Sequence, residues 1–296
     1  MESVVVSQSP STAQPGPSQA GVLPDSPLVV IEPSGSWLSL GLRDIWAYRE
    51  LLYFLIWRDV KVRYKQTALG VIWVILQPLL TTLIFTVFLG KLARVPSDGF
   101  PYAVFAYCGL LPWTFFAAAI TSSNNSLVGS SHLITKIYFP RMIIPAAAVG
   151  ARVVDFAIGF LNLIGLMVYY RVALTKSILV LPIVILLVTL LALGIGLWSA
   201  ALNVKYRDVG VLLPVLIQLW MFASPVVYPS SIVPAKYQWL YKFNPLTGIL
   251  DGFRASLLGQ QVDWPALGIS AGLTVGLLVY SAYAFRRMEK SFADVV

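Results

Sequence analysis

The sequence predicts an all-α membrane protein with six transmembrane helices. The chain of 296 residues is 58% hydrophobic and only 11% charged, whereas about a quarter of the residues in a soluble domain are charged. Long windows contain no Asp, Glu, Lys or Arg, and the Lys and Arg residues gather between them. A chain this apolar cannot cover its surface with water-compatible groups, so lipid is its expected solvent.

Five windows without a charged residue are long enough to cross a bilayer, which takes about 20 apolar residues in a helix. A sixth apolar region is interrupted only by Arg152 and Asp155. The polar stretch TSSNNSLVGSSH at 121–132 predicts a loop after the second span. The expected spans are 68–90, 102–121, 142–170, 177–202, 209–229 and 264–285.

The distribution of Lys and Arg predicts that both termini lie in the cytoplasm. With the N-terminus inside, the inner segments hold 13 Lys and Arg residues and the outer segments hold seven. Cytoplasmic loops carry this excess in membrane proteins. We therefore expect a multi-pass protein of the cell (inner) membrane. The net charge of +8 follows from this bias and does not indicate nucleic acid as a partner.

Two segments precede the predicted six-span domain at 67–296. Residues 1–36 are rich in Ser, Pro, Gln and Gly and contain no Lys or Arg, which predicts a disordered tail. Residues 37–66 have helical periodicity, with an apolar stripe and a separate stripe that includes Arg58 and Lys61. This pattern predicts an amphipathic helix lying on the membrane surface.

The longest outer loop, from Tyr228 to Trp264, contains the stretch LYKFNPLTGILDGFRASLLG. This stretch is too short to span the membrane and too apolar for an ordinary loop. We therefore expect a re-entrant or interfacial helical hairpin between the fifth and sixth spans.

Arg152 and Asp155 are the only charged residues inside a predicted span. They are three residues apart, so they share a helix face and can neutralise each other. An ion-coupled carrier needs such groups at membrane depth. However, a carboxylate already paired with Arg is a poor proton carrier. A structural ion pair that locks two helices is the favoured interpretation.

An intramembrane enzyme is a further alternative. The single histidine, His132, follows Ser130 and Ser131, but a nucleophile and its base need a spatial arrangement that sequence adjacency does not provide. The single Cys108 excludes an internal disulfide and a Cys-based metal cluster. We therefore expect neither a catalytic site nor a metal site on this chain.

Several motifs resemble those of one known family. RDVKVRYKQTALGVIWVILQPLL at 58–80 resembles the N-terminal signature of ABC type-2 permeases that export polysaccharides and polyol phosphates. LITKIYFPR at 133–141 and NVKYRDV at 203–209 resemble the family's two cytoplasmic loops. SPVVYP at 224–229 and NPLTGILDGFR at 244–254 resemble its outer loop. The resemblance extends over about 40–290 of the chain.

This resemblance implies one transmembrane subunit of an exporter of O-antigen, capsule or teichoic acid type. It implies a homodimer, two copies of a cytoplasmic ABC ATPase that binds ATP and Mg, surrounding membrane lipids, and a polysaccharide or lipid-linked glycan as substrate. The chain itself has no G-x-x-x-x-G-K-[ST] phosphate loop, so no cofactor is expected on it. A lipid or drug exporter of the same type is the alternative.

The resemblance also suggests where the ATPase binds. We expect residues 130–141 to form a short docking helix beside the basic N-terminal helix, with a smaller contact at 206–208. The expected coupling residues are Arg58, Asp59, Arg63, Lys136, Tyr138, Phe139, Arg141, Tyr206, Arg207 and Asp208. Among these, Tyr138 and Phe139 are expected to fill an apolar cleft on the ATPase.

Aromatic residues gather toward the outer ends of the second and fifth spans. Tyr102 and Tyr228 fit the belt of Tyr and Trp found at headgroup level, whereas others lie deeper. We expect at least one deeper ring to line the dimer pore, where it would contact sugar rings or close the resting pore. Packing against lipid is the alternative. The candidates are Trp113, Phe115, Phe116, Trp220 and Phe222.

Overall fold

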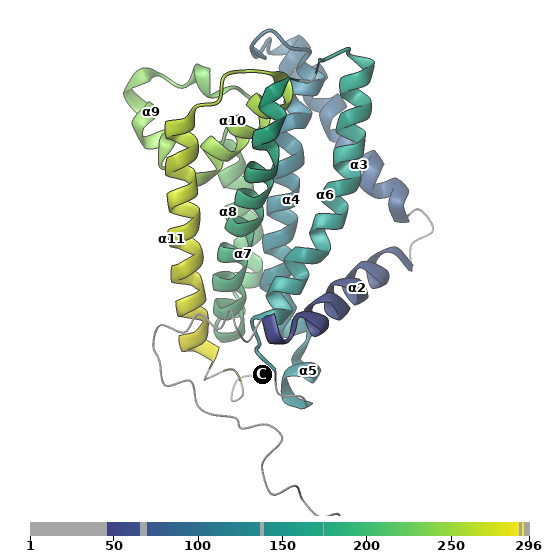
Figure 1. Ribbon diagram of the computed structural model, residues 1–296, viewed down its shortest axis with the longest axis vertical. Helices are drawn as coiled ribbons and strands as arrows, with labels where there is room; N and C mark the ends of the chain where they lie inside the picture. Colours follow the sequence, from purple (N-terminus) through teal and green to yellow (C-terminus); the bar gives the residue numbers. More distant parts are fainter. Residues whose placement is uncertain (1–45, 66–69, 137–138, 174, 290–291, 293–296) are drawn as a thin grey trace, which may run out of the picture. The chain divides into compact units, whose positions relative to one another are not determined.

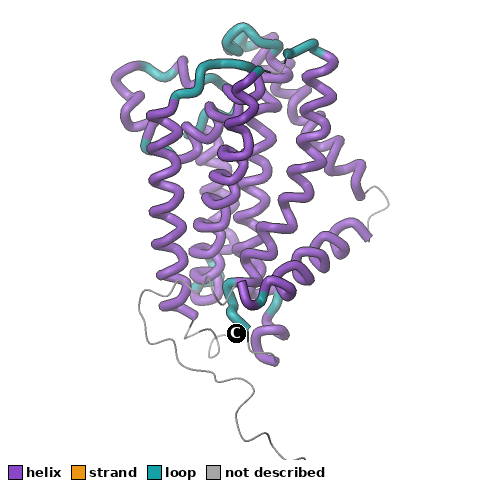
Figure 2. Tube along the Cα trace, in the orientation of Figure 1, coloured by secondary structure: helices purple, strands orange, loops and turns teal. Residues whose placement is uncertain are grey.

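A computed structural model describes residues 46–65, 70–136, 139–173, 175–289 and 292. Within these residues the chain is built from helices and connecting loops, without strands (Figure 2). The predicted tail at 1–36 and the beginning of the predicted surface helix lie outside the described residues. The elements are α2 (Arg49–Lys65), α3 (Gly70–Phe85), η1 (Thr86–Leu92), α4 (Tyr102–Gly129), α5 (Ser131–Lys136), α6 (Ile143–Tyr169), η2 (Lys176–Val180), α7 (Leu181–Lys205), α8 (Val209–Phe222), η3 (Ser230–Ile232), α9 (Ala235–Lys242), α10 (Pro245–Leu258) and α11 (Trp264–Glu289).

Five helical segments of the described residues are long and apolar enough to cross a membrane. They are Ile72–Leu92, Tyr102–Gly129, Ile143–Tyr169, Lys176–Lys205 and Trp264–Glu289. Each corresponds to one of the predicted spans. Hydrogen bonds within a helix satisfy every interior backbone group, which is why helices suit a lipid environment.

The predicted span at 209–229 is a shorter helix than expected. α8 ends at Phe222 after 14 residues, which gives a length of about 21 Å at helical rise. The hydrocarbon core is about 30 Å thick. The chain then turns without helical structure up to Pro229, and we name residues 224–229 the 224–229 turn. Pro225 disfavours helical geometry in the residue before it.

The second span is longer than predicted, and the expected loop at 121–132 is wrong for most of its length. α4 continues as a helix to Gly129. Some of its polar side chains bond to neighbouring helices: Ser122 Oγ accepts from Arg152 Nε of α6 at 2.8 Å, and Asn125 Oδ1 accepts from Asn203 Nδ2 of α7 at 3.4 Å. Asn203 of α7 donates its Nδ2 to the Asn124 carbonyl oxygen at 3.0 Å. Polar contacts between helices therefore replace the solvent that the sequence pattern had suggested.

α4 is the central helix of the described part. It packs against α6, α7 and α10, and α7 packs in turn against α11 (Figure 1). Close approach between α7 and α11 depends on Gly194, where a Cβ atom would lie 3.1 Å from the Leu278 Cα. Small residues permit such contacts between membrane helices, where packing is the main attractive force.

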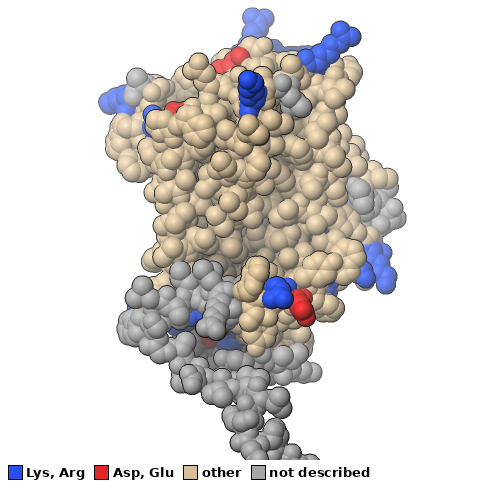
Figure 3. Space-filling view, in the orientation of Figure 1, with Lys and Arg blue, Asp and Glu red and all other residues tan. Residues whose placement is uncertain are grey.

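The helices run between two ends that carry most of the charge. The α5 end holds α5 and the α7–α8 turn, and the α9 end holds α9 and the beginning of α4 (Figure 1). On the face drawn in Figure 3, Lys and Arg lie toward these ends and uncharged residues fill the band between them. This is the surface expected of a protein whose middle lies in lipid.

Two further segments complete the described part. α2 packs against α6 through Leu55 and Ile56, while Tyr53, Phe54 and Trp57 on its other side are exposed. Apolar residues therefore occupy both faces of α2, unlike the simple apolar and basic faces predicted. At the α9 end, α9 and α10 follow α8, and 13 of the 14 residues of α10 are buried.

Candidate functional site

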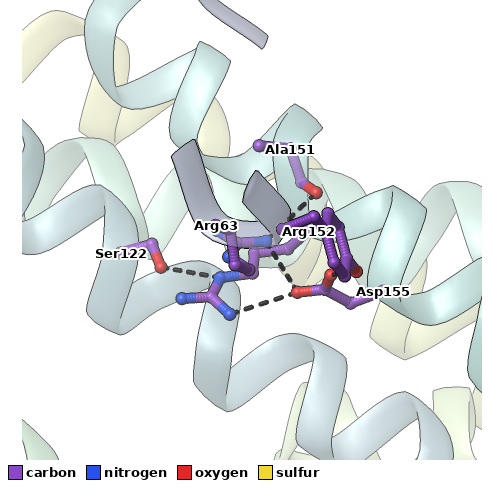
Figure 4. Close-up of polar contacts among 6 residues, drawn as sticks. Arg63, Ser122, Ala151, Arg152 and Asp155 are labelled. Carbon is purple, nitrogen blue, oxygen red and sulfur yellow. Dashed lines mark hydrogen bonds and ion pairs between the residues drawn. The ribbon is translucent and has the colours of Figure 1, made fainter. Parts of the chain in front are cut away.

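Asp155 on α6 is the centre of a polar cluster formed by three helices (Figure 4). Its Oδ2 accepts hydrogen bonds from Arg63 Nη1 of α2 at 2.7 Å and from Arg152 Nη1 at 3.1 Å. The Tyr64 hydroxyl of α2 donates to Oδ1 of the same carboxylate. Arg152 Nε donates to Ser122 Oγ on α4 at 2.8 Å. One carboxylate therefore joins α2 to α6, and Arg152 extends the connection to α4.

Spacing along α6 explains why Arg152 and Asp155 meet. Close packing of α2 against α6 explains why Arg63 joins them. Arg152 and Asp155 lie about one turn apart on α6, so they face the same way. α2 can approach because a glycine stands opposite it: a Cβ atom at Gly150 would lie 2.7 Å from Ile56 Cδ1. Arg63 Nη1 then also reaches the Ala151 carbonyl oxygen at 3.5 Å.

The cluster is half-buried and carries more positive than negative charge. The side chains of Arg63, Arg152 and Asp155 expose 25%, 27% and 19% of their surface. An exposed ion pair contributes roughly 0–1 kcal/mol to stability. These ion pairs are more buried than that, but they are not fully buried. Burial, and next the hydrogen bond to Asp155, raise the pKa of the Tyr64 hydroxyl. Tyr64 therefore keeps the proton that it donates.

A groove of about 630 Å³ lies beside the cluster, and we name it the α2 groove. Its walls include Arg58 and Asp59 of α2, Ser122 and Ser126 of α4, and Leu133 of α5. The arginine, carboxylate and hydroxyl groups of these walls can donate or accept hydrogen bonds, and Ser130 and His132 also line the groove. In the described part of the chain, no group of three or more His, Cys, Asp or Glu side chains could hold a metal ion.

The predicted coupling residues on α2 are engaged within the chain. Arg58 Nη2 pairs with Asp59 Oδ1 at 2.8 Å, and Arg63 pairs with Asp155. Asp59 therefore pairs with its neighbour Arg58 and not with Arg63, one turn later on the same helix. Arg58 and Asp59 line the α2 groove, so they remain within reach of a partner molecule.

The predicted coupling residues at the α7–α8 turn are exposed. Tyr206, Arg207 and Asp208 all present their side chains to the outside at the α5 end. Lys136 is the last residue of α5, which lies at the same end (Figure 1). Tyr138 lies outside the described residues.

Phe139 and Arg141 make contacts within the chain at the α5 end. Phe139 is 6% exposed and belongs to a buried cluster with Leu127 and Phe285. Arg141 donates its backbone N–H to Glu289 Oε1 at 3.1 Å and its Nη1 to the Glu289 carbonyl oxygen at 3.0 Å. Its own chain buries the Phe139 ring, and the expectation that this ring fills a cleft on the ATPase stays a prediction.

Three predicted pore residues are buried inside the single chain. Trp113 and Phe115 are 4% and 5% exposed, and Phe116 is fully buried. Phe115 packs edge-on against Phe156 of α6, and Phe116 packs edge-on against Trp220 of α8. Neighbouring helices of the same chain cover these rings, and their place in a dimer pore stays a prediction.

Phe222 and part of Trp220 lie at the surface instead. Phe222 is 63% exposed, and both rings border a second groove of about 560 Å³ at the α9 end. We name this the aromatic groove. It is lined by Trp220, Phe222, Ala223, Tyr228, Tyr237, Leu240, Tyr241, Phe243, Asn244 and Pro245.

Sequence reasoning missed several residues of these sites. Tyr64 and Ser122 contact the Asp155 cluster, but neither type nor spacing marks them in the sequence. The sequence does contain a signal for Arg63. A lone carboxylate in a span can attract a second arginine, and the charged segment before the first span supplies one. Arg254 belongs by position to the outer-loop cations, yet its side chain is 2% exposed.

Comparison with known proteins supplies a family for this architecture. The family model described as ABC-2 type transporter matches residues 50–258. The O-antigen export system permease protein RfbA of Myxococcus xanthus is 27% identical over 258 residues, which cover 86% of this chain and 98% of the relative. A protein of the same name from Klebsiella pneumoniae is 26% identical over 83% of this chain and 95% of its own length. The polysialic acid transport protein KpsM of Escherichia coli is 22% identical over 75% of this chain and 89% of its own length.

Proposed function

We propose that this chain, which belongs to the ABC-2 type transporter family, is the transmembrane subunit of an exporter that moves a polysaccharide across the cytoplasmic membrane. One observation carries the proposal. The similarity to permeases named for O-antigen and polysialic acid export extends over nearly the whole length of those proteins. The cargo class is therefore a free or lipid-linked polysaccharide or polyol phosphate.

The energy would come from a separate ATPase. Two copies of this chain would form the pathway, and two ATPase subunits carrying ATP and Mg would bind at the α5 end. The exposed Tyr206, Arg207 and Asp208 support this end as the contact surface. α5, which ends at Lys136, would supply the larger contact. Both termini of the chain would then face the cytoplasm, in agreement with the excess of Lys and Arg in the inner segments.

The Asp155 cluster would connect the ATPase contact to the membrane core. Arg58, Asp59 and Arg63 lie on α2, and Arg63 is bound to Asp155 of α6 at 2.7 Å. A displacement of α2 would therefore act directly on α6, and through Arg152 on Ser122 of α4. This connection favours a structural role for Asp155 over proton transport, because two arginines already bind its carboxylate.

The aromatic groove would belong to the cargo pathway at the α9 end. In the proposed topology α8 completes a sixth crossing together with the turn after it, and α9 and α10 form an interfacial or re-entrant hairpin. Trp220, Phe222 and their neighbours offer flat apolar faces. The C–H face of a sugar can lie on such a ring, and weak repeated contacts suit a polymer that must slide.

Reconstitution tests the proposed function. Vesicles that contain this chain and its cognate ATPase should accumulate a glycan or lipid-linked glycan only when ATP is present. An ATPase variant with its phosphate-loop lysine replaced by methionine is the control and should abolish transport. ATP-driven movement of phospholipid or an apolar drug, without glycan movement, would support the lipid or drug exporter instead. Glycan movement that follows an ion gradient without ATP would support the ion-coupled carrier.

A further inference from the structure

Arg254 carries a buried positive charge at the α9 end to which the proposed mechanism assigns no role. It lies on α10, and its side chain is 2% exposed. Its Cζ lies 4.1 Å from the ring centroid of Phe105 on α4. Asp251 Oδ1, one turn earlier on α10, is 3.7 Å from Arg254 Nη1. A buried guanidinium needs partners for its N–H groups, because the loss of hydration is otherwise uncompensated.

Those partners are backbone carbonyls of the turn at 224–229. Arg254 Nη2 donates to the Val226 carbonyl oxygen at 2.6 Å, and Nη1 reaches the Tyr228 carbonyl oxygen at 3.5 Å. The carbonyl between them, on Val227, accepts a hydrogen bond from the Tyr102 hydroxyl of α4 at 2.7 Å. Three successive carbonyls are thus bound by side chains of α10 and α4.

Gly109 allows α4 to approach this arrangement. A Cβ atom at position 109 would clash with the Val226 carbonyl oxygen and with Arg254 Nη2. The guanidinium therefore lies between α10, α4 and the turn, in contact with all three. Its position fixes how the turn lies on α4.

The same turn orients the aromatic groove. The Tyr228 hydroxyl donates to the Phe222 carbonyl oxygen at 2.7 Å and accepts from the Tyr241 hydroxyl at 2.9 Å. Asn244 completes this wall, because its Oδ1 accepts from Trp220 Nε1 at 3.1 Å and its Nδ2 donates to Ser224 Oγ at 2.8 Å. The ring positions in the groove therefore depend on the turn that Arg254 holds.

We propose that Arg254 is a positioning residue for export, which holds the 224–229 turn against α4 and thereby orients Tyr228 and the aromatic groove toward the departing glycan. This proposal rests on the proposed function as a polysaccharide exporter. The planar guanidinium suits the task because it can serve two carbonyls while stacking on a ring, which the ammonium group of lysine cannot do.

The experiment compares Arg254→Lys and Arg254→Met with Arg171→Lys, an exposed arginine at the same end. ATP-driven glycan export is measured in vesicles with the ATPase partner. A second measurement does not depend on activity: Ala223, an exposed residue of the groove, is replaced by Cys in a Cys108→Ala background. Its rate of reaction with a maleimide is then followed without ATP.

We expect both Arg254 variants to lower export by about tenfold or more, as misplacement of a binding surface by about 1 Å can do. We also expect a severalfold change in the labelling rate at position 223, with assembly of the ATPase complex retained. Arg171→Lys should leave both readouts unchanged. Full export by Arg254→Lys would overturn the proposal, as would lost export with unchanged labelling.

Tyr102→Phe keeps the test decisive if the Arg254 variants do not fold. It removes one hydrogen bond to the same turn and no charge. We expect it to change both readouts in the same direction but less, and no change in either would count against the proposal. If the parent protein exports no glycan while Arg254→Lys still alters labelling, the proposed function fails but the positioning role stands. If glycan export proceeds and is insensitive to Arg254, the proposed function stands and the positioning role fails.

Discussion

Replacing Asp155 with Asn removes the charge that Arg63 and Arg152 share but keeps the size of the side chain. In the unsubstituted protein both arginines bind the same oxygen, Asp155 Oδ2, at 2.7 and 3.1 Å. Without the carboxylate, two cations face one another in a half-buried place, and α2 loses its ionic connection to α6. We therefore expect both a less stable protein and a partly released α2.

The size of the effect follows from distance and exposure. Two opposite charges about 4 Å apart attract by about 4 kcal/mol at an effective dielectric constant of about 20. Fully exposed pairs contribute only about 0–1 kcal/mol. Because the three side chains are 19–27% exposed, we expect an intermediate loss. Asp155→Asn should lower the free energy of unfolding by about 2–3 kcal/mol, still below the roughly 3–5 kcal/mol of a broken buried pair.

Two measurements check this prediction. The first is the unfolding midpoint of the purified protein in nanodiscs. The second is maleimide labelling of Ile56→Cys in a Cys108→Ala background, because Ile56 packs against Gly150 of α6 only while α2 is docked. Asp59→Asn is the matched control: it removes the same charge from an ion pair within α2, and should change stability by less than about 0.5 kcal/mol.

Equal unfolding midpoints for the Asp155 and Asp59 variants, with position 56 still protected, would refute this reasoning. Exchange of Arg152 and Asp155 adds a sharper test. The exchange restores an ion pair within α6, so part of the stability should return. It leaves Arg63 and Tyr64 without a carboxylate at position 155, so position 56 should stay reactive. If Asp155→Asn instead folds normally and abolishes transport, the ion-coupled carrier is favoured.

Three further predictions address topology, coupling and packing. In a background without Cys108, an external membrane-impermeant maleimide should label Ser97→Cys and spare Lys205→Cys; labelling at position 205 would contradict the orientation. Arg207→Glu should weaken co-purification of the ATPase without affecting dimer formation, because Arg207 is exposed at the α5 end, and unchanged ATPase binding would remove it from the contact. Phe116→Ala should destabilise the protein by about 3 kcal/mol, since a fully buried ring is lost, whereas Phe222→Ala should slow export with stability unchanged. The reverse pattern in melting and transport assays would show that the two rings have been misassigned.

The long helices could be predicted because the signal for them is local. A run of some 20 apolar residues indicates a span whatever its neighbours are, and five such helical segments lie where the sequence placed them. The motifs at 58–80 and 203–209 indicated the family for the same reason, since each is read within one short segment. The ion pair of Arg152 with Asp155 also follows from spacing on one helix.

Helix ends depended on packing that the sequence pattern does not contain. The polar residues at 121–129 suggested a loop, yet α4 continues through them, and Ser122 and Asn125 bond to Arg152 of α6 and Asn203 of α7. Partners on a neighbouring helix can take the place of solvent for such polar groups. Composition alone therefore cannot distinguish a loop in water from a helix buried against polar partners.

The environment of each site residue was decided by tertiary structure. Arg63 meets Asp155 across 92 residues of sequence, and Arg254 meets Val226 across 28. The sequence determined that these are cations near membrane-spanning segments. Only the fold determined that Arg63 binds Asp155 of α6 and that Arg254 binds the backbone of the 224–229 turn. Hydrophobicity and spacing act within a helix or two, whereas burial and ion pairing depend on which distant helices come into contact.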